Sequence, residues 1–153
     1  MTDPLVGFFD GACEPTNPGG LSTGGWVLPA LGIEGCAAYC KGEESTNNVA
    51  EYSAAVDCLR EVWRTGWRGP VLLHGDSQLV VRQFSGVYRC RSPRVMPLLE
   101  KLRHAATFFE VVQLVWVPRA QNTEADRMSK VGFERHAAAF GFRVEDFGKS
   151  KGA

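Results

Sequence analysis

The feature that most constrains the fold is a short apolar run, Leu5–Phe9, that leads directly into Asp10. The run is aliphatic and aromatic and is followed by glycine, which is typical of a buried β-strand that ends in a turn. A carboxylate at the end of a central strand needs a partner, because an unpaired buried charge is very costly. No lysine or arginine occurs in the first 40 residues, so a metal ion is the favoured partner.

Three other acidic residues occupy related positions. Asp76 ends a second apolar run, Pro70–Gly75, while Glu51 and Asp126 fall in the first turns of predicted helices. Asn122 is expected to cap the helix that carries Asp126. Strand ends and helix starts can meet at one edge of an open sheet, where binding sites usually form. The four carboxylates are therefore expected to converge.

The order of the predicted elements indicates one α/β domain. Strands are expected over residues 5–10, 24–31, 33–39, 70–76 and 109–117, and helices over 49–63, 78–84, 93–107 and from 122 onward. A helix between the third and fourth strands implies a right-handed crossover. We expect a five-stranded mixed sheet, with three antiparallel strands followed by two more, flanked by helices. Residues 1–140 would form the domain and residues 141–153 a frayed tail.

Clustered carboxylates of this kind favour a metal-dependent reaction. Their mutual repulsion would raise their pKa values, and hard divalent cations remove that repulsion. Ligation by oxygen alone suits Mg²⁺ or Mn²⁺ better than zinc. Two such ions can support in-line phosphoryl displacement, one by activating water and the other by stabilising the leaving oxygen. Taken singly, Glu51 or Asp126 is better explained as a surface charge or a helix cap, whereas that explanation is weaker for Asp76 and weakest for Asp10, so the prediction depends on the set.

Bulk composition excludes some classes of protein. No apolar stretch approaches the ~20 residues of a membrane span, and we expect no signal peptide, because residues 1–4 lack a basic region followed by an apolar core. Five scattered cysteines without a Cys-x-x-Cys pair indicate reduced thiols. We expect a cytoplasmic monomer.

The charged residues give two conflicting indications about whether the protein binds nucleic acid. The 17 basic and 17 acidic residues cancel, whereas nucleic-acid-binding proteins usually carry a basic excess. Four arginines nevertheless gather within residues 81–94. They are Arg82, Arg89, Arg91 and Arg94.

The acids belong to longer motifs that resemble those of type 1 ribonuclease H, in the order found in that family. These motifs are Phe9-Asp10-Gly11-Ala12-Cys13 with Asn17-Pro18-Gly19, Thr46-Asn47-Asn48-Val49-Ala50-Glu51, Gly75-Asp76-Ser77-Gln78-Leu79-Val80, and Trp116-Val117-Pro118-Arg119 with Asn122-Thr123-Glu124-Ala125-Asp126. The resemblance spans residues 5–138, and its second and third motifs are the most specific.

The resemblance implies an endonuclease that hydrolyses the RNA strand of RNA/DNA hybrids and leaves 3′-hydroxyl and 5′-phosphate ends. It implies two Mg²⁺ ions, with Mn²⁺ able to substitute, held by Asp10, Glu51, Asp76 and Asp126. It also implies substrate contacts by Gly11, Cys13, Asn17, Asn47, Asn48, Ser77 and Gln78. Side-chain amides suit this role because they both donate to and accept from the 2′-hydroxyl that distinguishes RNA from DNA.

The sequence departs from the family pattern in two ways. The loop before the last aspartate, residues 118–121, lacks the histidine of many members, and Arg119 is our candidate to contact the scissile phosphate in its place. The basic protrusion of some members is absent or reduced to residues 86–94, which predicts weak, salt-sensitive binding. Three alternatives remain on the same fold: another nuclease or recombinase, a double-stranded RNA nuclease, and a non-catalytic hybrid-binding module.

Overall fold

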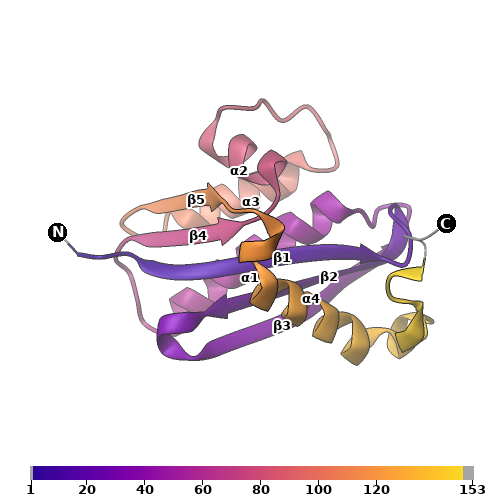
Figure 1. Ribbon diagram of the computed structural model, residues 1–153. Helices are drawn as coiled ribbons and strands as arrows, with labels where there is room; N and C mark the ends of the chain where they lie inside the picture. Colours follow the sequence, from indigo (N-terminus) through magenta and orange to yellow (C-terminus); the bar gives the residue numbers. More distant parts are fainter. Residues whose placement is uncertain (1, 150–153) are drawn as a thin grey trace.

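One mixed sheet organises residues 2–149, the part of the chain that the computed structural model describes (Figure 1). Its strands are β1 (Leu5–Glu14), β2 (Gly19–Leu28), β3 (Ile33–Gly42), β4 (Val71–Gly75) and β5 (Val112–Trp116). They lie in the order β3-β2-β1-β4-β5. The first three strands pair antiparallel, and β4 pairs parallel with both β1 and β5. The predicted five-stranded mixed sheet is confirmed.

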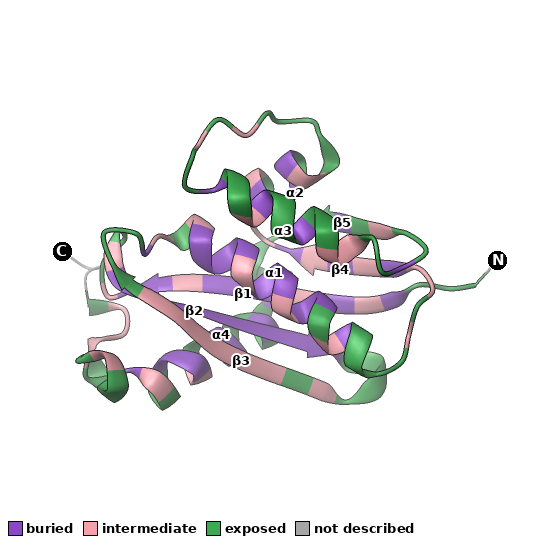
Figure 2. Ribbon diagram, turned by 180° about the vertical axis from the view of Figure 1, so that it is seen from behind, coloured by how far each residue is buried: buried purple, intermediate pink, exposed green. Residues whose placement is uncertain are grey.

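Helices cover both faces of this sheet. They are α1 (Asn47–Arg64), α2 (Gln78–Ser85), α3 (Met96–Ala106) and α4 (Thr123–His136). Helices α1, α2 and α3 lie on one face, and α4 crosses the other face over β1, β2 and β3 (Figures 1 and 2). Strand β2 is buried along almost its whole length because helices cover it on both sides. Among residues 2–149, no helix is long and apolar enough to cross a membrane.

The main core lies between the sheet and helices α1 and α3. Phe9 of β1 and Leu73 of β4 are fully buried there against Leu59 of α1 and Leu102 of α3. The side chains of β4 alternate, so Val71 and Leu73 enter the core while the residues between them face the other side. All five cysteines are free, as predicted.

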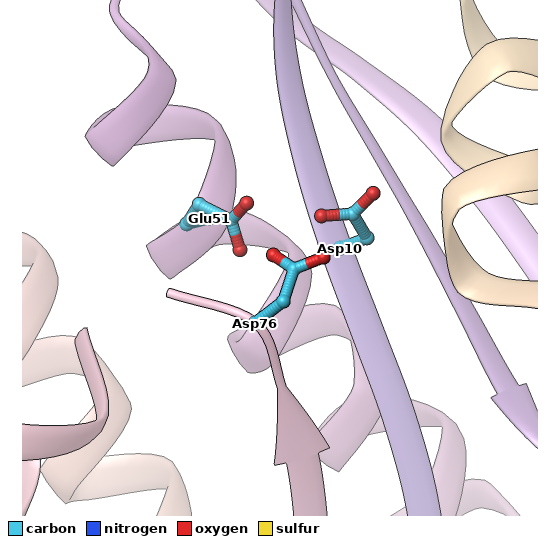
Figure 3. Close-up of side chains that lie close together, drawn as sticks. All are labelled: Asp10, Glu51 and Asp76. Carbon is cyan, nitrogen blue, oxygen red and sulfur yellow. The ribbon is translucent and has the colours of Figure 1, made fainter. Parts of the chain in front are cut away.

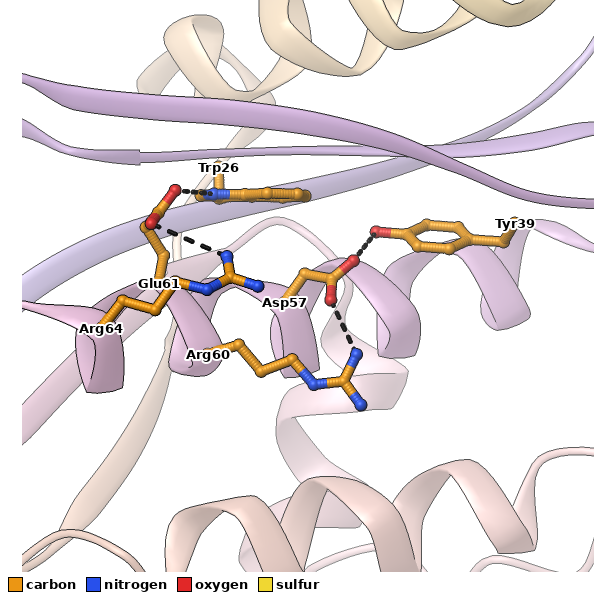
Figure 4. A network of polar contacts seen from close by, with 6 residues as sticks. All are labelled: Trp26, Tyr39, Asp57, Arg60, Glu61 and Arg64. Atoms are coloured by element: carbon orange, nitrogen blue, oxygen red, sulfur yellow. Dashed lines mark hydrogen bonds and ion pairs between the residues drawn. The ribbon is translucent and has the colours of Figure 1, made fainter.

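Polar contacts tie the outer part of α1 to the sheet (Figure 4). The Trp26 indole on β2 donates to Glu61 at 3.2 Å, and the Tyr39 hydroxyl on β3 donates to Asp57 at 3.0 Å. An arginine one turn along α1 pairs with each of these carboxylates. These contacts fix the position of α1, the helix that carries Glu51.

Strand β1 continues past Asp10, and our prediction of a turn there was wrong. Asp10 pairs with Gly25 of β2, and the antiparallel pairing runs on to Glu14. Pairing between β1 and β4 stops at Phe8 and His74. Asp10 therefore lies inside its own strand, yet just beyond the point where the neighbouring strand ends.

Several other boundaries differ from prediction. Helix α1 begins at Asn47, because the Thr46 hydroxyl caps it by accepting from the Val49 N–H at 3.2 Å. Glu51 therefore lies in the second turn rather than the first. Strand β2 starts at Gly19, earlier than predicted, and β5 is shorter than predicted, at Val112–Trp116. Shorter 3₁₀ segments occupy Pro29–Leu31, Arg119–Gln121, Ala138–Phe140 and Val144–Asp146.

The predicted frayed tail is wrong for residues 141–149. Phe142 and Phe147 pack against the fully buried Phe133 of α4, in a small cluster with Leu21 and Ala137. The remainder of the predicted tail, residues 150–153, lies outside the described residues.

Candidate active site

A glycine at position 11 lets strand β1 and helix α1 touch backbone to backbone. A Cβ atom there would lie 2.3 Å from the Ala50 carbonyl carbon and 2.4 Å from the Glu51 nitrogen, distances at which no side chain fits. The helix therefore presses directly on the strand next to Asp10. Strand β4 ends at Gly75 beside β1, so Asp76 leaves the sheet at the same place.

This arrangement brings Asp10, Glu51 and Asp76 together (Figure 3). Each of the three offers a carboxylate oxygen, and these oxygens all lie within 4.8 Å of one another. Asp10 is 2 % exposed and Glu51 is 3 % exposed, while Asp76 is half-buried. The predicted convergence of these three acids is present in the structure.

The cluster is electrostatically unfavourable by itself. Burial raises the pKa of Asp10 far above its usual range, and the charges of Glu51 and Asp76 raise it further. Burial also raises the pKa of Glu51, and the nearby Arg119 guanidinium offsets part of that effect. The protein itself thus supplies too little positive charge for these carboxylates, which makes a bound cation the natural complement.

The donor set fits a hard divalent cation. Every ligand atom offered is a carboxylate oxygen, the type that Mg²⁺ and Mn²⁺ prefer. The buried Oε2 atom of Glu51 has no hydrogen-bond partner within the described residues. A buried polar atom left in this way is costly, and coordination would satisfy it.

Asp126 lies at the rim of the cluster rather than inside it. It is exposed, in the first turn of α4 as predicted, and it is not among the three acids whose oxygens lie within 4.8 Å. It is close enough to hydrogen-bond to Asp10, a contact that raises the pKa of Asp10. The fourth acid therefore borders the site on its open side.

An open pocket of 320 Å³ lies next to Asp10 and contains most of the predicted substrate residues. Its lining consists of Gly11, Ala12, Cys13, Glu14, Asn17, Asn47, Arg119, Asp126 and Phe147. Gly11, Cys13, Asn17, Asn47, Arg119 and Asp126 among them were predicted from the sequence. The Asn47 N–H donates to the Asn17 side-chain oxygen at 3.0 Å, which fixes the loop containing Asn17 against the start of α1.

Three predicted substrate residues lie outside that lining. Asn48 is half-buried in the first turn of α1, and the exposed Gln78 begins α2. The Ser77 hydroxyl caps α2 by accepting from the Val80 N–H at 3.3 Å. Ser77 and Gln78 directly follow Asp76 in the chain, so they adjoin the carboxylate cluster rather than the pocket.

Two residues of this region were not predicted to belong to it. Asn122 was expected to cap α4, but its side chain makes no capping hydrogen bond and points to Phe9 and Asp76 instead. Phe147 was assigned to a frayed tail and lines the pocket. Nothing in the local sequence separates a capping asparagine from one that turns inward. The aromatic residues at 140, 142 and 147 were a usable signal, because disordered tails are poor in them.

Comparison with known proteins gives a consistent result. The family model described as reverse transcriptase-like matches residues 8–132. The ribonuclease HI of Halobacterium salinarum is 35% identical over 126 residues, which cover 80% of this chain and 60% of that protein. The bifunctional protein Rv2228c of Mycobacterium tuberculosis is 38% identical over 85 residues, 56% of this chain but only 23% of that protein. The chain therefore spans about a quarter to three fifths of the length of these relatives.

Solved structures agree with the sequence matches. The crystal structure of the Halobacterium salinarum RNase H1 superposes with a TM-score of 0.77 at 30% identity, covering 87% of this chain and 99% of that one. LC11-RNase H1, isolated from compost and crystallised with an RNA/DNA hybrid, gives a TM-score of 0.75 at 27% identity, covering 86% and 98%. With its sheet order, its acidic cluster and these matches, the chain belongs to the type 1 ribonuclease H family.

Proposed function

We propose that this protein is a metal-dependent endoribonuclease that hydrolyses the RNA strand of RNA/DNA hybrids, leaving 3′-hydroxyl and 5′-phosphate ends. The observation that carries the proposal is the buried carboxylate cluster of Asp10, Glu51 and Asp76 at the edge of a pocket lined by amide side chains. A module that only bound nucleic acid would gain nothing from clustered negative charge facing phosphates. The cluster therefore favours hydrolysis over binding alone.

Asp10, Glu51, Asp76 and Asp126 would hold two Mg²⁺ ions, with Mn²⁺ as the substitute. Bound divalent ions supply Lewis-acid stabilisation of phosphoryl oxygens and lower the pKa of water. The protein's own contribution is to hold Asp10 and Glu51 almost without solvent contact and to leave Asp126 exposed on the open side. Because the acids are preorganised, little reorganisation accompanies the reaction.

The pocket beside the cluster supports recognition of RNA. The hydrogen bond from Asn47 N–H occupies one lone pair of the Asn17 Oδ1 atom and leaves its amide N–H₂ free to turn toward a ligand. The relative LC11-RNase H1 was crystallised with an RNA/DNA hybrid, and a hybrid is the substrate we propose here. Asn17, Asn47, Asn48 and Gln78 would read 2′-hydroxyls, assisted by Gly11, Cys13 and Ser77.

Arg119 is proposed to contact the scissile phosphate. It lines the same pocket as Asn17 and Asn47, and its charge lowers the pKa of Glu51. A guanidinium suits this role because it binds phosphate oxygens bidentately and stays charged at every relevant pH. We expect Arg119→Ala to lower kcat about 10–100-fold, whereas Arg119→Lys should retain part of the rate because it keeps the charge.

Cleavage of an RNA/DNA hybrid labelled on the RNA strand tests the proposal. We expect cutting with Mg²⁺, none with EDTA, and none by Asp10→Asn even with Mg²⁺. The products should carry 5′-phosphate ends, which a phosphatase followed by kinase labelling detects. Binding without cutting in either Mg²⁺ or Mn²⁺ would instead identify a hybrid-binding module.

The same assay on three further duplexes separates the remaining alternatives. Double-stranded RNA, double-stranded DNA and a hybrid labelled on its DNA strand should all remain intact under conditions that degrade the RNA of the hybrid. Cleavage of double-stranded RNA at a comparable rate would favour the double-stranded RNA nuclease. Cleavage of DNA would favour another nuclease or a recombinase on this fold.

A further inference from the structure

The segment after α4 folds back onto the domain and carries an aromatic ring to the pocket. The Phe147 ring meets the Phe133 ring edge-on at 5.4 Å between centroids, and the Lys130 ammonium lies 5.7 Å from the Phe147 centroid. The Phe142 ring also packs against Phe133, with 6.3 Å between the two ring centroids. Apolar contact with α4 therefore anchors residues 142–147.

Hydrogen bonds and ion pairs fix the same segment. The Gly148 N–H donates to the Glu14 carboxylate at 3.0 Å, and Glu14 is only 1 % exposed at the end of β1. Asp146 accepts from the Arg143 N–H at 2.9 Å and pairs with Lys149 at 3.5 Å. Two contacts thus hold Phe147 in position. Its own ring packs on Phe133 of α4, and the next residue, Gly148, is hydrogen-bonded to Glu14.

Among the described residues that line the 320 Å³ pocket, Phe147 is the one with an aromatic side chain. It shares the pocket with Asn17 and Asn47, the proposed readers of the 2′-hydroxyl, and with Asp126. Its ring is half-buried, unlike the fully buried Phe133 on which it rests. The ring therefore packs on α4 and also borders the pocket, so a ligand in this pocket would meet it, whereas Phe142 of the same cluster is not part of the lining.

We propose that Phe147 is a substrate-binding residue that packs against a sugar of the bound RNA/DNA hybrid, next to the 2′-hydroxyl contacts of Asn17 and Asn47. In a duplex the bases are stacked on one another, so the apolar C–H face of a sugar is the surface that a ring at the groove wall can cover. This inference deepens the proposed function and rests on it. Phe147 then forms part of one wall of the substrate groove.

Paired variants separate substrate contact from packing. Phe147→Ala removes the pocket wall, while Phe142→Ala removes a ring from the same aromatic cluster without touching the pocket. We expect both variants to melt at a lower temperature, and only Phe147→Ala to raise KM for the hybrid, about 5–10-fold, with kcat within twofold of wild type. Phe147→Leu should recover most of the affinity, because a leucine can cover the same sugar face.

Binding is also measured without turnover, by anisotropy of a labelled hybrid with the Asp10→Asn variant in Mg²⁺. We expect Phe147→Ala in that background to raise Kd by the same 5–10-fold. Equal KM and Kd for the Phe147→Ala and Phe142→Ala proteins would overturn the inference and leave the proposed nuclease intact. If wild type cleaves no hybrid, the nuclease proposal fails, and the binding data still decide whether Phe147 contacts a hybrid.

Discussion

The side-chain amide of Asn122 joins two parts of the candidate metal site. Its Nδ2 atom donates to the Phe9 carbonyl oxygen at 2.9 Å and lies 3.5 Å from an Asp76 carboxylate oxygen. Asn122 is 1 % exposed, and Phe9 directly precedes Asp10. One buried amide therefore sets the separation between strand β1 and the carboxylate that follows β4.

We expect Asn122→Ala to weaken metal-dependent activity about 10–100-fold, the usual effect of losing a group that orients a metal ligand. The Mg²⁺ concentration for half-maximal rate should rise, whereas KM for the hybrid should change little. Gln121→Ala, an exposed neighbour, is the control and should behave as wild type. An unchanged Mg²⁺ dependence in Asn122→Ala would show that Asp76 keeps its position without this amide.

The sequence predicts the acidic residues of the site better than it predicts the residues that hold them in position. Asp10 and Asp76 follow apolar runs, and because those runs are buried as neighbouring strands, the two acids lie close together. The inward turn of Asn122 depends on Phe9, 113 residues away in the chain, and asparagine before a helix is equally good as a cap. Such a choice is made by tertiary contact, so no local pattern reveals it.

The main error in the prediction of strand β1, a turn after Asp10, came from the interpretation of Gly11. Gly11 looked like a turn residue, yet it serves the close approach of β1 to α1. Strand β2 has the same property at Gly25, where a Cβ would lie 2.3 Å from the Ser129 nitrogen of α4. Glycine in a strand can mark either a turn or a tight backbone contact, and only the packed structure distinguishes them.

Neutralising Asp10 should stabilise the metal-free protein. Its carboxylate is buried beside Glu51 and Asp76, so ionisation costs free energy that an amide of the same shape avoids. We expect the Tm of Asp10→Asn in EDTA to exceed that of wild type by several degrees, since ~1 kcal/mol corresponds to about 2–4 °C in a domain of this size. Added Mg²⁺ should raise the Tm of wild type more than that of the variant. A lower Tm for the variant in EDTA would contradict this account of the cluster.

The same raised pKa values predict the direction of a pH effect. Asp10 and Glu51 hold protons more tightly in the folded state than in the unfolded state, with the pKa of Glu51 near 8. Unfolding therefore releases protons, and the contribution of this cluster to stability falls as pH rises from about 5 to 8. In EDTA, wild type should lose stability over this range more steeply than Asp10→Asn. Chemical denaturation at several pH values measures the difference between the two slopes.

Tyr39→Phe should reduce stability without affecting activity. The variant loses the 3.0 Å hydrogen bond to Asp57, and Asp57 keeps its ion pair with Arg60 at 3.1 Å. A cost of about 0.5–1.5 kcal/mol is expected for one such bond. Urea denaturation should show the loss, while kcat/KM should remain within twofold of wild type, because Asp57 lies more than a turn along α1 from Glu51. A large loss of activity would mean that this contact also positions Glu51.

Arginines of the α2–α3 loop should account for part of the salt dependence of hybrid binding. Arg89 and Arg91 are both exposed, whereas Arg94 pairs with Glu44 at 3.2 Å and Arg82 hydrogen-bonds to Tyr88. Each arginine that contacts a phosphate contributes about one unit to the slope of log K against log salt concentration. We expect the Arg89→Ala, Arg91→Ala double variant to bind more weakly and to reduce that slope by about 1–2 units.

Arg135→Ala is the matched control for this charge change. Arg135 lies in the last turn of α4, the helix that covers the opposite face of the sheet from α2 and α3. Its removal lowers the net charge as each loop substitution does, but it should leave the salt slope unchanged. Equal slopes for wild type, the loop double variant and Arg135→Ala would show that the loop does not contact phosphates. A smaller slope in the loop variant alone would place phosphates of the hybrid against the loop between α2 and α3.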